Sequence, residues 1–380
     1  MRWRVLVLDA SARQALAAVR TLGRLGHEVG TAGYRGVELA GLSRYAARYH
    51  GLPDPRTDGE AFRRALEREV EAHAYDVVVA SDESTLARFR VAAPSIPSYP
   101  AVDDVWVRLT DKVALGEIAK DAGVGYPRTA AASDLVIQAS IGDGVVVKPS
   151  RSAEPQGDGV AAHVGATVTS DPTVAAHMVE QLRSAGLAPI VQQRIPRKDK
   201  VNLTVFRRGG ASEMRFVYRV VRDVPLTGGI AMATQTIDPH AGVGAAAIDA
   251  LERVLDAAGY EGVANGEFVV DESGELVLIE VNPRLWGSTW FAERLGQRVV
   301  ERGIRHALRL EPLPAVPYPV GKRFHHLPGE LRWLTLHPLK RAAALDLARS
   351  LRPGDVFEYD DWSDAGALAR YALLRLRRAR

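Results

Sequence analysis

Residues 263–284 read VANGEFVVDESGELVLIEVNPR, and two acidic side chains and an amide interrupt the apolar runs. Two runs rich in β-branched and aromatic residues flank the polar stretch 271–274, a pattern that predicts a β-hairpin. Because alternate residues of a strand share a face, Glu280 and Asn282 should project together, about 7 Å apart. A turn of either two or four residues would place Glu267 on that same face.

The second strand of this hairpin, 276–282, has apolar residues on both faces, with Leu278 on the face of Glu280, so we expect it to be largely covered. A buried carboxylate without a partner is costly, whereas two carboxylates and an amide oxygen that converge on one point suit Mg²⁺. Since Mg²⁺ takes few carboxylates and completes its shell with phosphate oxygens, a nucleoside triphosphate is implied. The alternatives are an edge hairpin with solvated glutamates and an ion pair between Glu280 and Arg284.

The length and composition restrict the class of protein. A chain of 380 residues suits two or three domains. Hydrophobic residues make up 47%, the mean hydropathy is −0.09, and no apolar run approaches the length of about 18 residues that crosses a bilayer. The chain has no cysteine, which excludes disulfides, thiolate catalysis and cysteine-based zinc sites. We expect a cytoplasmic protein with no membrane partner.

The charge balance gives little indication of a polyanionic partner. Lysine and arginine number 49 against 46 aspartates and glutamates, a net charge of +3. The pI of about 9.1 is therefore weak evidence for nucleic acid, and we expect no nucleic-acid partner. One basic cluster stands at the C-terminus, from Arg370 to Arg380. A solvated helix end explains it, and contact with acidic lipid or a partner stays open.

The first hundred residues alternate between strand-like and helix-like segments. The expected elements are strands at 5–8, 27–32 and 76–80 and helices at 12–25, 60–73 and after Glu83. This βα repeat predicts a parallel sheet that binds ligands at the carboxyl ends of its strands, where Asp9 and Asp82 lie. The first strand runs into Asp-Ala-Ser-Ala-Arg and not into a G-x-G-x-x-G turn, so a dinucleotide-binding oxidoreductase is not expected.

The middle of the chain follows a Pro/Ser-rich linker. The expected elements are the linker at 94–100, a helix at 111–122 with Thr110 as N-cap, a strand at 145–149, a loop without periodicity at 150–159, a helix near 172–185 and a strand at 190–193. Residues 311–380 open with a proline-rich connector and become mostly helical.

Five of these segments stand in a characteristic order. They are DK (111–112), VVVKP (145–149), IVQQRIP (190–196), NGEF (265–268) and IEVNPR (279–284). This order resembles the ATP-grasp superfamily, and NPRLWGS at 282–288 resembles its carboxylate–amine ligase branch; the likeness extends over residues 1–310. It implies an α/β fold that is α+β in the ATP-binding lobes. The implied domains are a Rossmann-like βα domain (1–105), a two-lobed ATP-grasp domain (106–310) and a helical C-terminal extension (311–380).

The resemblance assigns Lys112 and Lys148 to the phosphates of ATP, a role that suits long cationic side chains. Lys148 follows three valines and is poorly explained as core; its alternative is to reach solvent along the apolar surface. Lys112 lies in the first turn of a helix, where the dipole disfavours a cation, so its alternative is an exposed lysine. The loop at 150–159, with Gly157 and Gly159, resembles the flap that closes over the phosphates, and an ordinary surface loop is the alternative.

The segment 190–196 resembles the hinge whose backbone binds adenine. The resemblance therefore implies nucleotide contacts by Gln192, Gln193 and Ile195. Related sequences often carry glutamate at the position of Gln193, which is a departure from the pattern. The residue that binds ribose is not evident, and Asp199 is the candidate.

Glu267, Glu280 and Asn282 match the magnesium ligands of the superfamily, and Arg284 matches the arginine that contacts the transferred phosphate. The implied cofactors are ATP and Mg²⁺, with two ions expected and Mn²⁺ as an alternative metal. Together with the two lysines, these groups would neutralise the charge that migrates during phosphoryl transfer.

The span 219–234 resembles the acceptor side of the site, where Arg222 would hold a carboxylate as a catalytic residue beside Arg284; an ordinary strand-flanking arginine is the alternative. A carboxylate is a poor electrophile. The resemblance implies that ATP converts it to an acyl phosphate, which an amine attacks to give an amide or peptide-like bond, ADP and phosphate. The expected partners are a small carboxylic acid and an amine, with amino acids among the candidates, and a homodimer stays open.

Two other functions stay open. One is a bicarbonate-activating, carboxylase-like enzyme, although the sequence has no evident biotin-carrier segment with a Met-Lys pair. The other is a non-catalytic ATP-binding scaffold or sensor. The presence of both lysines and all three magnesium-ligand matches argues against the scaffold.

Overall fold

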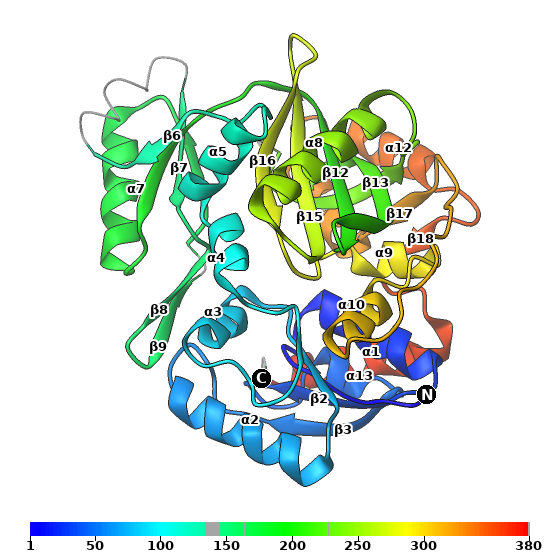
Figure 1. Cartoon of the computed structure of the whole chain (residues 1–380). Helices are drawn as coiled ribbons and strands as arrows, with labels where there is room; N and C mark the ends of the chain where they lie inside the picture. The colour runs from blue at the N-terminus through cyan, green and yellow to red at the C-terminus, as the bar shows by residue number, and fades with distance from the viewer. Residues whose placement is uncertain (134–143, 163, 227, 379–380) are drawn as a thin grey trace.

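A five-stranded parallel sheet forms the N-terminal part of the molecule in the computed structural model, which describes residues 1–133, 144–162, 164–226 and 228–378 (Figure 1). The strand order is β3-β2-β1-β4-β5. Its elements are β1 (Arg4–Val7), α1 (Arg13–Arg24), β2 (Glu28–Gly33), the 3₁₀ helix η1 (Leu39–Leu42), β3 (Ala46–Gly51), α2 (Gly59–His73), β4 (Val77–Val79), α3 (Glu83–Val91) and β5 (Ser98–Tyr99). The predicted βα repeat is confirmed. The sequence did not indicate β3, which is polar, or β5, which lies within the expected linker.

Alternation along β1 sends its side chains into two cores. Val5 and Val7 pack with α1, whereas Leu6 and Leu8 pack with α2 and α3. The sheet is therefore covered by helices on both faces, which explains why β1 is an uninterrupted apolar run.

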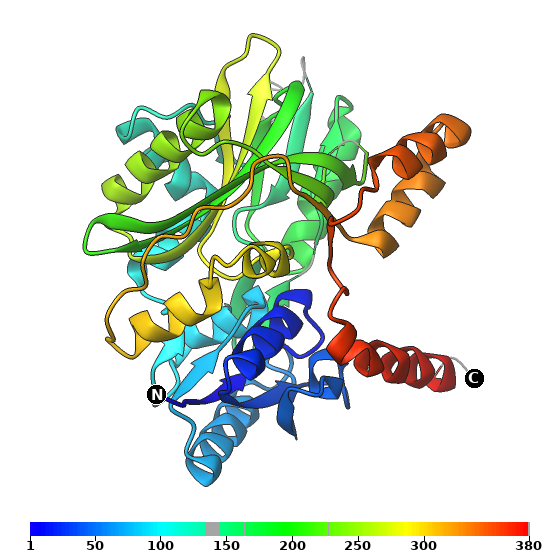
Figure 2. The same ribbon diagram turned by 90° about the vertical axis from the view of Figure 1, so that its right-hand side faces the viewer.

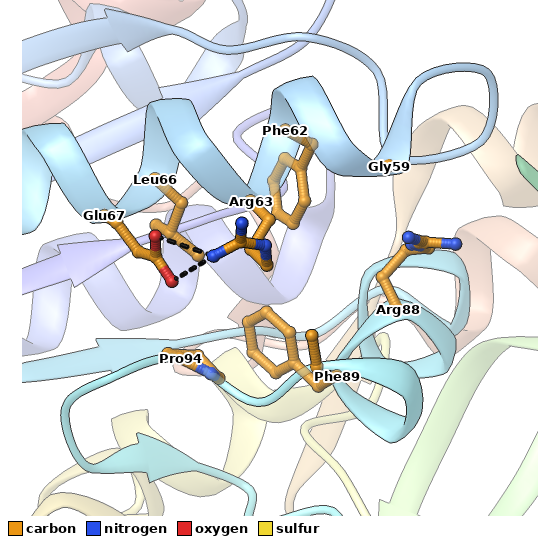
Figure 3. A pocket seen from close by; sticks show the side chains of 9 residues that line it. Gly59, Phe62, Arg63, Leu66, Glu67, Arg88, Phe89 and Pro94 are labelled. Carbon is orange, nitrogen blue, oxygen red and sulfur yellow. Dashed lines mark hydrogen bonds and ion pairs between the residues drawn. The ribbon is translucent and has the colours of Figure 1, made fainter. Parts of the chain in front are cut away.

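A small cavity lies between α2 and α3, with Phe62 and Phe89 on its walls (Figure 3). Its volume is about 10 Å³, which is room for at most one water molecule. Arg63 closes one side by donating to the two carboxylate oxygens of Glu67 at 2.8 and 2.9 Å. This cavity is too small for a substrate.

An antiparallel four-stranded sheet follows, in the order β10-β7-β11-β6. Its elements are β6 (Thr129–Ala131), β7 (Val145–Pro149), β10 (Thr167–Thr169), α7 (Pro172–Ser184) and β11 (Pro189–Gln193), and α4 (Asp104–Thr110) and α5 (Lys112–Asp121) precede them. Val145, Val147 and Val191 pack beneath α7. Lys148 is the neighbour of Val147 and therefore points to the opposite face of this sheet.

The helix predicted at 111–122 has a different N-cap from the one expected. Asp111 caps α5, because its carboxylate accepts from the backbone N–H groups of Val113 and Ala114 at 2.9 and 3.1 Å. Thr110 instead ends α4, where its hydroxyl donates to carbonyls of the preceding turn. The two helices adjoin, so the aspartate is the residue that stands at the break between them.

The segment 150–159, expected as a loop, contains most of a β-hairpin made by β8 (Ala153–Gln156) and β9 (Gly159–Ala162). Its tip packs on the N-terminal part of the molecule (Figure 1). The backbone N–H of Gly59 donates to the Asp158 carbonyl at 2.7 Å, and Arg88 donates to the Gly157 carbonyl at 3.2 Å. These partners come from a distant part of the chain, so local periodicity could not reveal the hairpin.

The largest sheet has seven strands in the order β16-β15-β12-β13-β14-β17-β18. They are β12 (Arg197–Arg208), β13 (Ala211–Val224), β14 (Ile230–Thr236), β15 (Gly262–Asp271), β16 (Leu276–Asn282), β17 (Arg323–His325) and β18 (Val356–Phe357). Helix α8 (Gly242–Ala258) covers one face of this sheet. Helices α9 (Thr289–Arg294) and α10 (Val299–Ala307) pack between its other face and α1 (Figure 2).

The C-terminal region contributes strands as well as helices. Because β17 and β18 continue the seven-stranded sheet, the boundary expected at 310 does not coincide with the end of that sheet. The other elements are α11 (Leu327–Leu336), α12 (Lys340–Ser350), the 3₁₀ helix η3 (Trp362–Asp364) and α13 (Ala365–Arg378). Helices α11 and α12 project as a pair, whereas α13 returns to the N-terminal part (Figure 2), where Arg20 pairs with Asp364 at 2.9 Å.

The described residues contain no helix that is long and apolar enough to span a membrane. Arg380, the last residue of the basic cluster, lies outside the described residues.

The hairpin of β15 and β16 pairs Glu267 with Glu280 as predicted, but its turn length differs from the prediction and its second strand contains a bulge. Five residues, 271–275, separate the first cross-strand pair, where a turn of even length was expected. An odd number alone would place Glu280 on the opposite face from Glu267. An extra residue, Ile279, bulges from β16 and restores the pairing of the two glutamates. The bulge also moves Leu278, which lies in the core beneath α8 and not on the face of Glu280 as expected.

Candidate active site

Lys148 lies where the polar faces of the four-stranded and seven-stranded sheets meet. The residue is 7% exposed. Burial, followed by the charge of Lys112, lowers the pKa of Lys148 to about 8, while Glu280 and Glu267 oppose that shift. Four ionisable groups from four elements are therefore close enough to influence one another. A desolvated ammonium group of this kind favours an anionic ligand, which would restore its full charge.

Lys112 approaches the same place from α5. It is 4% exposed, although the first turn of a helix ordinarily faces solvent. Its Nζ donates to the Ser150 carbonyl at 3.3 Å, and its backbone N–H donates to the same carbonyl at 3.1 Å. The Ser150 hydroxyl donates to Asp111 at 2.9 Å. The end of β7 is thereby fixed to the start of α5, which holds the two lysines near each other.

The oxygen-bearing side chains converge on the facing hairpin. Glu267 is directly opposite Glu280, and Asn282 follows on the same face. Lys200 on β12 pairs with Glu267 at 2.7 Å. The ion pair between Glu280 and Arg284, one of the alternatives, is not formed within the described part of the chain.

Strand β16 lies at the edge of its sheet, as in the alternative of an edge hairpin with solvated glutamates. This edge is nevertheless covered. Helices α4 and α5 pack along it, and Gly125 pairs with Val277 on its outer side. Asn282 is 7% exposed, and Glu267 and Glu280 are half-buried. The two glutamates therefore face the interior of the site and are not fully solvated.

The donor set fits magnesium. Asn202 lies on β12 directly opposite Glu267, is 4% exposed, and its Oδ1 has no hydrogen-bond partner among the described residues. Buried side-chain oxygens are nearly always paired. An unpaired amide oxygen beside two carboxylates and a second amide makes a hard, oxygen-rich environment, which is the kind that Mg²⁺ prefers.

Arg284 connects the end of β16 to the N-terminal part of the molecule. Its guanidinium donates to Oε1 of Glu83 from Nη2 at 2.7 Å and from Nε at 3.2 Å. Burial would raise the pKa of Glu83, but Arg284 and Lys112 outweigh burial and lower it. Glu83 is therefore held as a carboxylate beside both cations, at the first residue of α3.

The three residues expected to contact adenine lie where the chain passes from one sheet to the other. Gln192 is 2% exposed and shares a face of the four-stranded sheet with Lys148. Gln193 points to the other face, as its place in the strand requires. Ile195 is half-buried in the short connector at 194–196. The connector thus lies beside the face of the four-stranded sheet that carries Lys148. Gln192 points to that same face.

The structure does not bring Asp199, the candidate for ribose, to this place. Along β12, Asp199 precedes Lys200, whose side chain reaches the site, so the two lie on opposite faces of the sheet. On its own face Asp199 pairs with Arg219 at 2.6 Å. The start of β12 and hence its alternation were not evident from the sequence, which explains the misplaced candidate.

Arg222 is not at the site either. It is 3% exposed, and its guanidinium pairs with Glu330 of α11 and Asp346 of α12, each at 2.7 Å. The pairing of β13 with β14 is irregular on both sides of Arg222. Arg222 therefore binds the C-terminal helices, which corresponds to the structural alternative. Within the span 219–234, residue 227 lies outside the described residues.

Three residues of the site, Glu83, Lys200 and Asn202, were not predicted from the sequence. Glu83 directly follows Asp82 after a strand of the parallel sheet, a position where ligands are expected, yet only the helix start was noted there. Asn202 sits in the apolar run VNLTVF, the same kind of anomaly that singled out the hairpin. Lys200 gave no such signal, because only the tertiary structure places it beside Glu267.

Comparison with known proteins identifies solved structures of similar fold. No family model and no curated protein matches the sequence. Among solved structures, an N5-carboxyaminoimidazole synthetase from Staphylococcus aureus is 14% identical with a TM-score of 0.62, over 84% of this chain and 81% of that chain. An L-amino acid ligase from Bacillus licheniformis is 16% identical with a TM-score of 0.64, over 82% and 75%. A biotin carboxylase in complex with β,γ-ATP from Campylobacter jejuni is 16% identical with a TM-score of 0.65, over 85% and 74%.

These three structures share their fold with this chain, although the sequences are only 14–16% identical. The fold expected from the order of the five sequence segments is confirmed: the chain has the ATP-grasp fold.

Proposed function

We propose that this protein is an ATP- and Mg²⁺-dependent ligase that activates a carboxylate as an acyl phosphate and joins it to an amine. The observation that carries the proposal is that two buried lysines face a converging set of oxygen donors across the junction of two sheets. Cations on one side and metal-binding oxygens on the other make the two halves of a binding site for a metal-bound triphosphate.

The proposed reaction has two steps. The γ-phosphoryl group of ATP moves to a carboxylate oxygen while its bond to ADP breaks. The amine nitrogen then attacks the acyl carbon, phosphate leaves, and the nitrogen loses a proton. A bound Mg²⁺ supplies charge neutralisation at the phosphate oxygens. No covalent intermediate with the protein is needed.

The residues of the chain would divide the work by position. Lys112 and Lys148 would bind the phosphates, and Glu267, Glu280 and Asn282 would hold the metal. Each role rests on burial and on the charges around the group, because a dry, preorganised site stabilises developing charge more than water does.

Arg284 stands between the nucleotide site and the N-terminal sheet, where it is bound to Glu83. We place the transferred phosphoryl group within its reach. The acid and the amine would then enter between α3 and the end of β16. An L-amino acid ligase is among the proteins of similar fold, which makes amino acids the first substrates to test.

An ADP-release screen tests the proposal. The full chain is incubated with ATP, Mg²⁺ and pairs of small carboxylic acids and amines, amino acids included. We expect release that requires both an acid and an amine. Glu280→Gln should abolish it, whereas Glu272→Gln, the same substitution at an exposed position of the same hairpin, should not. Full activity of Glu280→Gln would show that the metal assignment is wrong.

Two outcomes favour the other functions. Two of the proteins of similar fold carry carboxylase or carboxyaminoimidazole in their names. ADP release that requires bicarbonate in place of the organic acid would therefore favour a carboxylase-like enzyme. Binding of Mg-ATP with no ADP release across the whole set would favour the scaffold.

A further inference from the structure

Three side chains that commonly bind metals lie together on the N-terminal sheet, outside the proposed nucleotide site. His50 comes from β3, the edge strand, and Glu69 and His73 come from α2 (Figure 1). Because residues four apart share one face of a helix, Glu69 and His73 stand side by side. The cluster therefore combines a strand and a helix that are joined by a loop in the sequence.

The ligand atoms of the cluster converge. Oε2 of Glu69 is 2.8 Å from Nδ1 of His50 and 3.4 Å from Nε2 of His73, and all three lie within 4.8 Å of one another. In a tetrahedral zinc site, neighbouring ligand atoms are about 3.4 Å apart, given bonds of about 2.0–2.1 Å. Small rotations of these side chains would therefore let one ion contact all three.

The surroundings of His50 prepare it to bind a metal. The hydroxyl oxygen of Tyr75 lies 2.7 Å from its Nε2, a position from which it can accept the proton of that nitrogen. A hydrogen bond at the far ring nitrogen is a regular feature of metal-binding histidines, because it orients the ring and the free lone pair. Nδ1 of His50 and Oε2 of Glu69 are in direct contact at 2.8 Å, and a cation bound to both would take the place of that contact.

The exposure of the three residues is also suitable. His50 is 8% exposed, whereas the side chains of Glu69 and His73 are each 30% exposed. The cluster is therefore buried on the side of His50 and open to solvent on the side of Glu69 and His73.

We propose that His50, Glu69 and His73 bind one divalent transition-metal ion of the Zn²⁺ type, with water at the open position. Two imidazole nitrogens and one carboxylate favour such an ion over Mg²⁺, which prefers oxygen ligands alone. The bound ion joins the edge strand β3 to α2. This site is independent of the proposed ligase activity.

A zinc titration of the full chain tests the proposal. Chelator-treated protein, in excess Mg²⁺ to occupy oxygen-rich sites, is titrated with ZnCl₂ against a chromophoric chelator. We expect one Zn²⁺ per chain. Tyr75→Phe should weaken binding by about 10–100-fold, the usual effect of losing the hydrogen-bond partner of a ligand, and His73→Gln by more than about 100-fold. His177→Gln is the matched control, because His177 is exposed and also contacts a residue four positions away, Gln181, at 3.0 Å.

Thermal unfolding gives a second readout. Zn²⁺ should raise the Tm of the wild-type chain and of His177→Gln, because a ligand that binds only the folded state stabilises it. It should not raise the Tm of His73→Gln or Glu69→Gln, and circular dichroism establishes that both variants fold. Wild-type affinity in His73→Gln, or no stoichiometric binding to the wild-type chain at micromolar Zn²⁺, would overturn the proposal.

Discussion

The protonation state of Lys148 gives a quantitative prediction about nucleotide binding. Its pKa is lowered to about 8, first by burial and then by the charge of Lys112. About 10% of the free protein is therefore neutral at this position at pH 7, about 50% at pH 8 and about 90% at pH 9. Phosphate oxygens beside the amine favour its charged form and raise the pKa again.

Binding of a nucleotide should therefore take up protons. If the bound-state pKa exceeds 10, uptake is about 0.1 proton per site at pH 7, about 0.5 at pH 8 and about 0.9 at pH 9. By the same linkage, the Kd should increase about tenfold between pH 7 and pH 9. The sign is fixed, because the protonated form of Lys148 is the form that binds.

Calorimetric titration measures this uptake. A non-hydrolysable ATP analogue with Mg²⁺ is titrated at each pH in two buffers that differ in ionisation enthalpy, and the difference in observed enthalpy gives the protons exchanged. Lys148→Met should remove the uptake that rises with pH, whereas Lys120→Met, at an exposed position of α5, should leave it unchanged. The same rising uptake in Lys148→Met would show that Lys148 is not the group that takes up the proton.

Three further predictions concern particular contacts. Arg222→Met should lower the free energy of unfolding in urea by about 3–5 kcal/mol, because Glu330 is left buried without this ion-pair partner, while the KM for ATP stays the same; a changed KM with unchanged stability would contradict this. Glu83→Gln should lower the free energy of unfolding by about 1–2 kcal/mol. This loss is smaller than for a fully buried ion pair, because the side chains of Glu83 and Arg284 are 18% and 20% exposed. An unchanged urea midpoint would contradict this prediction. Deletion of Ile279 should leave nucleotide-dependent Mn²⁺ binding, followed by electron paramagnetic resonance, within about threefold of the wild-type value, since removal of the extra residue keeps Glu280 opposite Glu267; a loss of more than about tenfold would contradict the assignment of Ile279 as the extra residue.

The sequence predicted most where the deciding information is local. The βα repeat followed from hydrophobic periodicity, and the hairpin followed from turn residues between β-branched runs. The pairing of Glu267 with Glu280 was predicted correctly, but partly because an odd separation and the bulge at Ile279 offset each other. A bulge adds one residue without changing composition, so nothing in the sequence indicates it.

The remaining features depend on contacts between distant segments. Hairpin β8–β9 is ordered by α2 and α3, and Glu83 meets Arg284 only when the N-terminal sheet packs on the rest of the chain. For Asp199, the start of β12 decides which face of the strand the side chain takes, and the sequence did not indicate that start. Arg222 is held by α11 and α12, whose sequences show helical character but not their place in the fold.

We propose that the hairpin of β15 and β16 holds the metal of a metal–nucleotide complex. A crystal structure of the full chain with Mn²⁺ and a non-hydrolysable ATP analogue tests it most directly, because anomalous scattering locates the manganese. We expect a peak about 2.1 Å from oxygens of Glu267, Glu280 and Asn282, with the phosphates between them and Lys148. Manganese and phosphates bound at another place, with this hairpin free of both, would show that the hairpin is not the metal site.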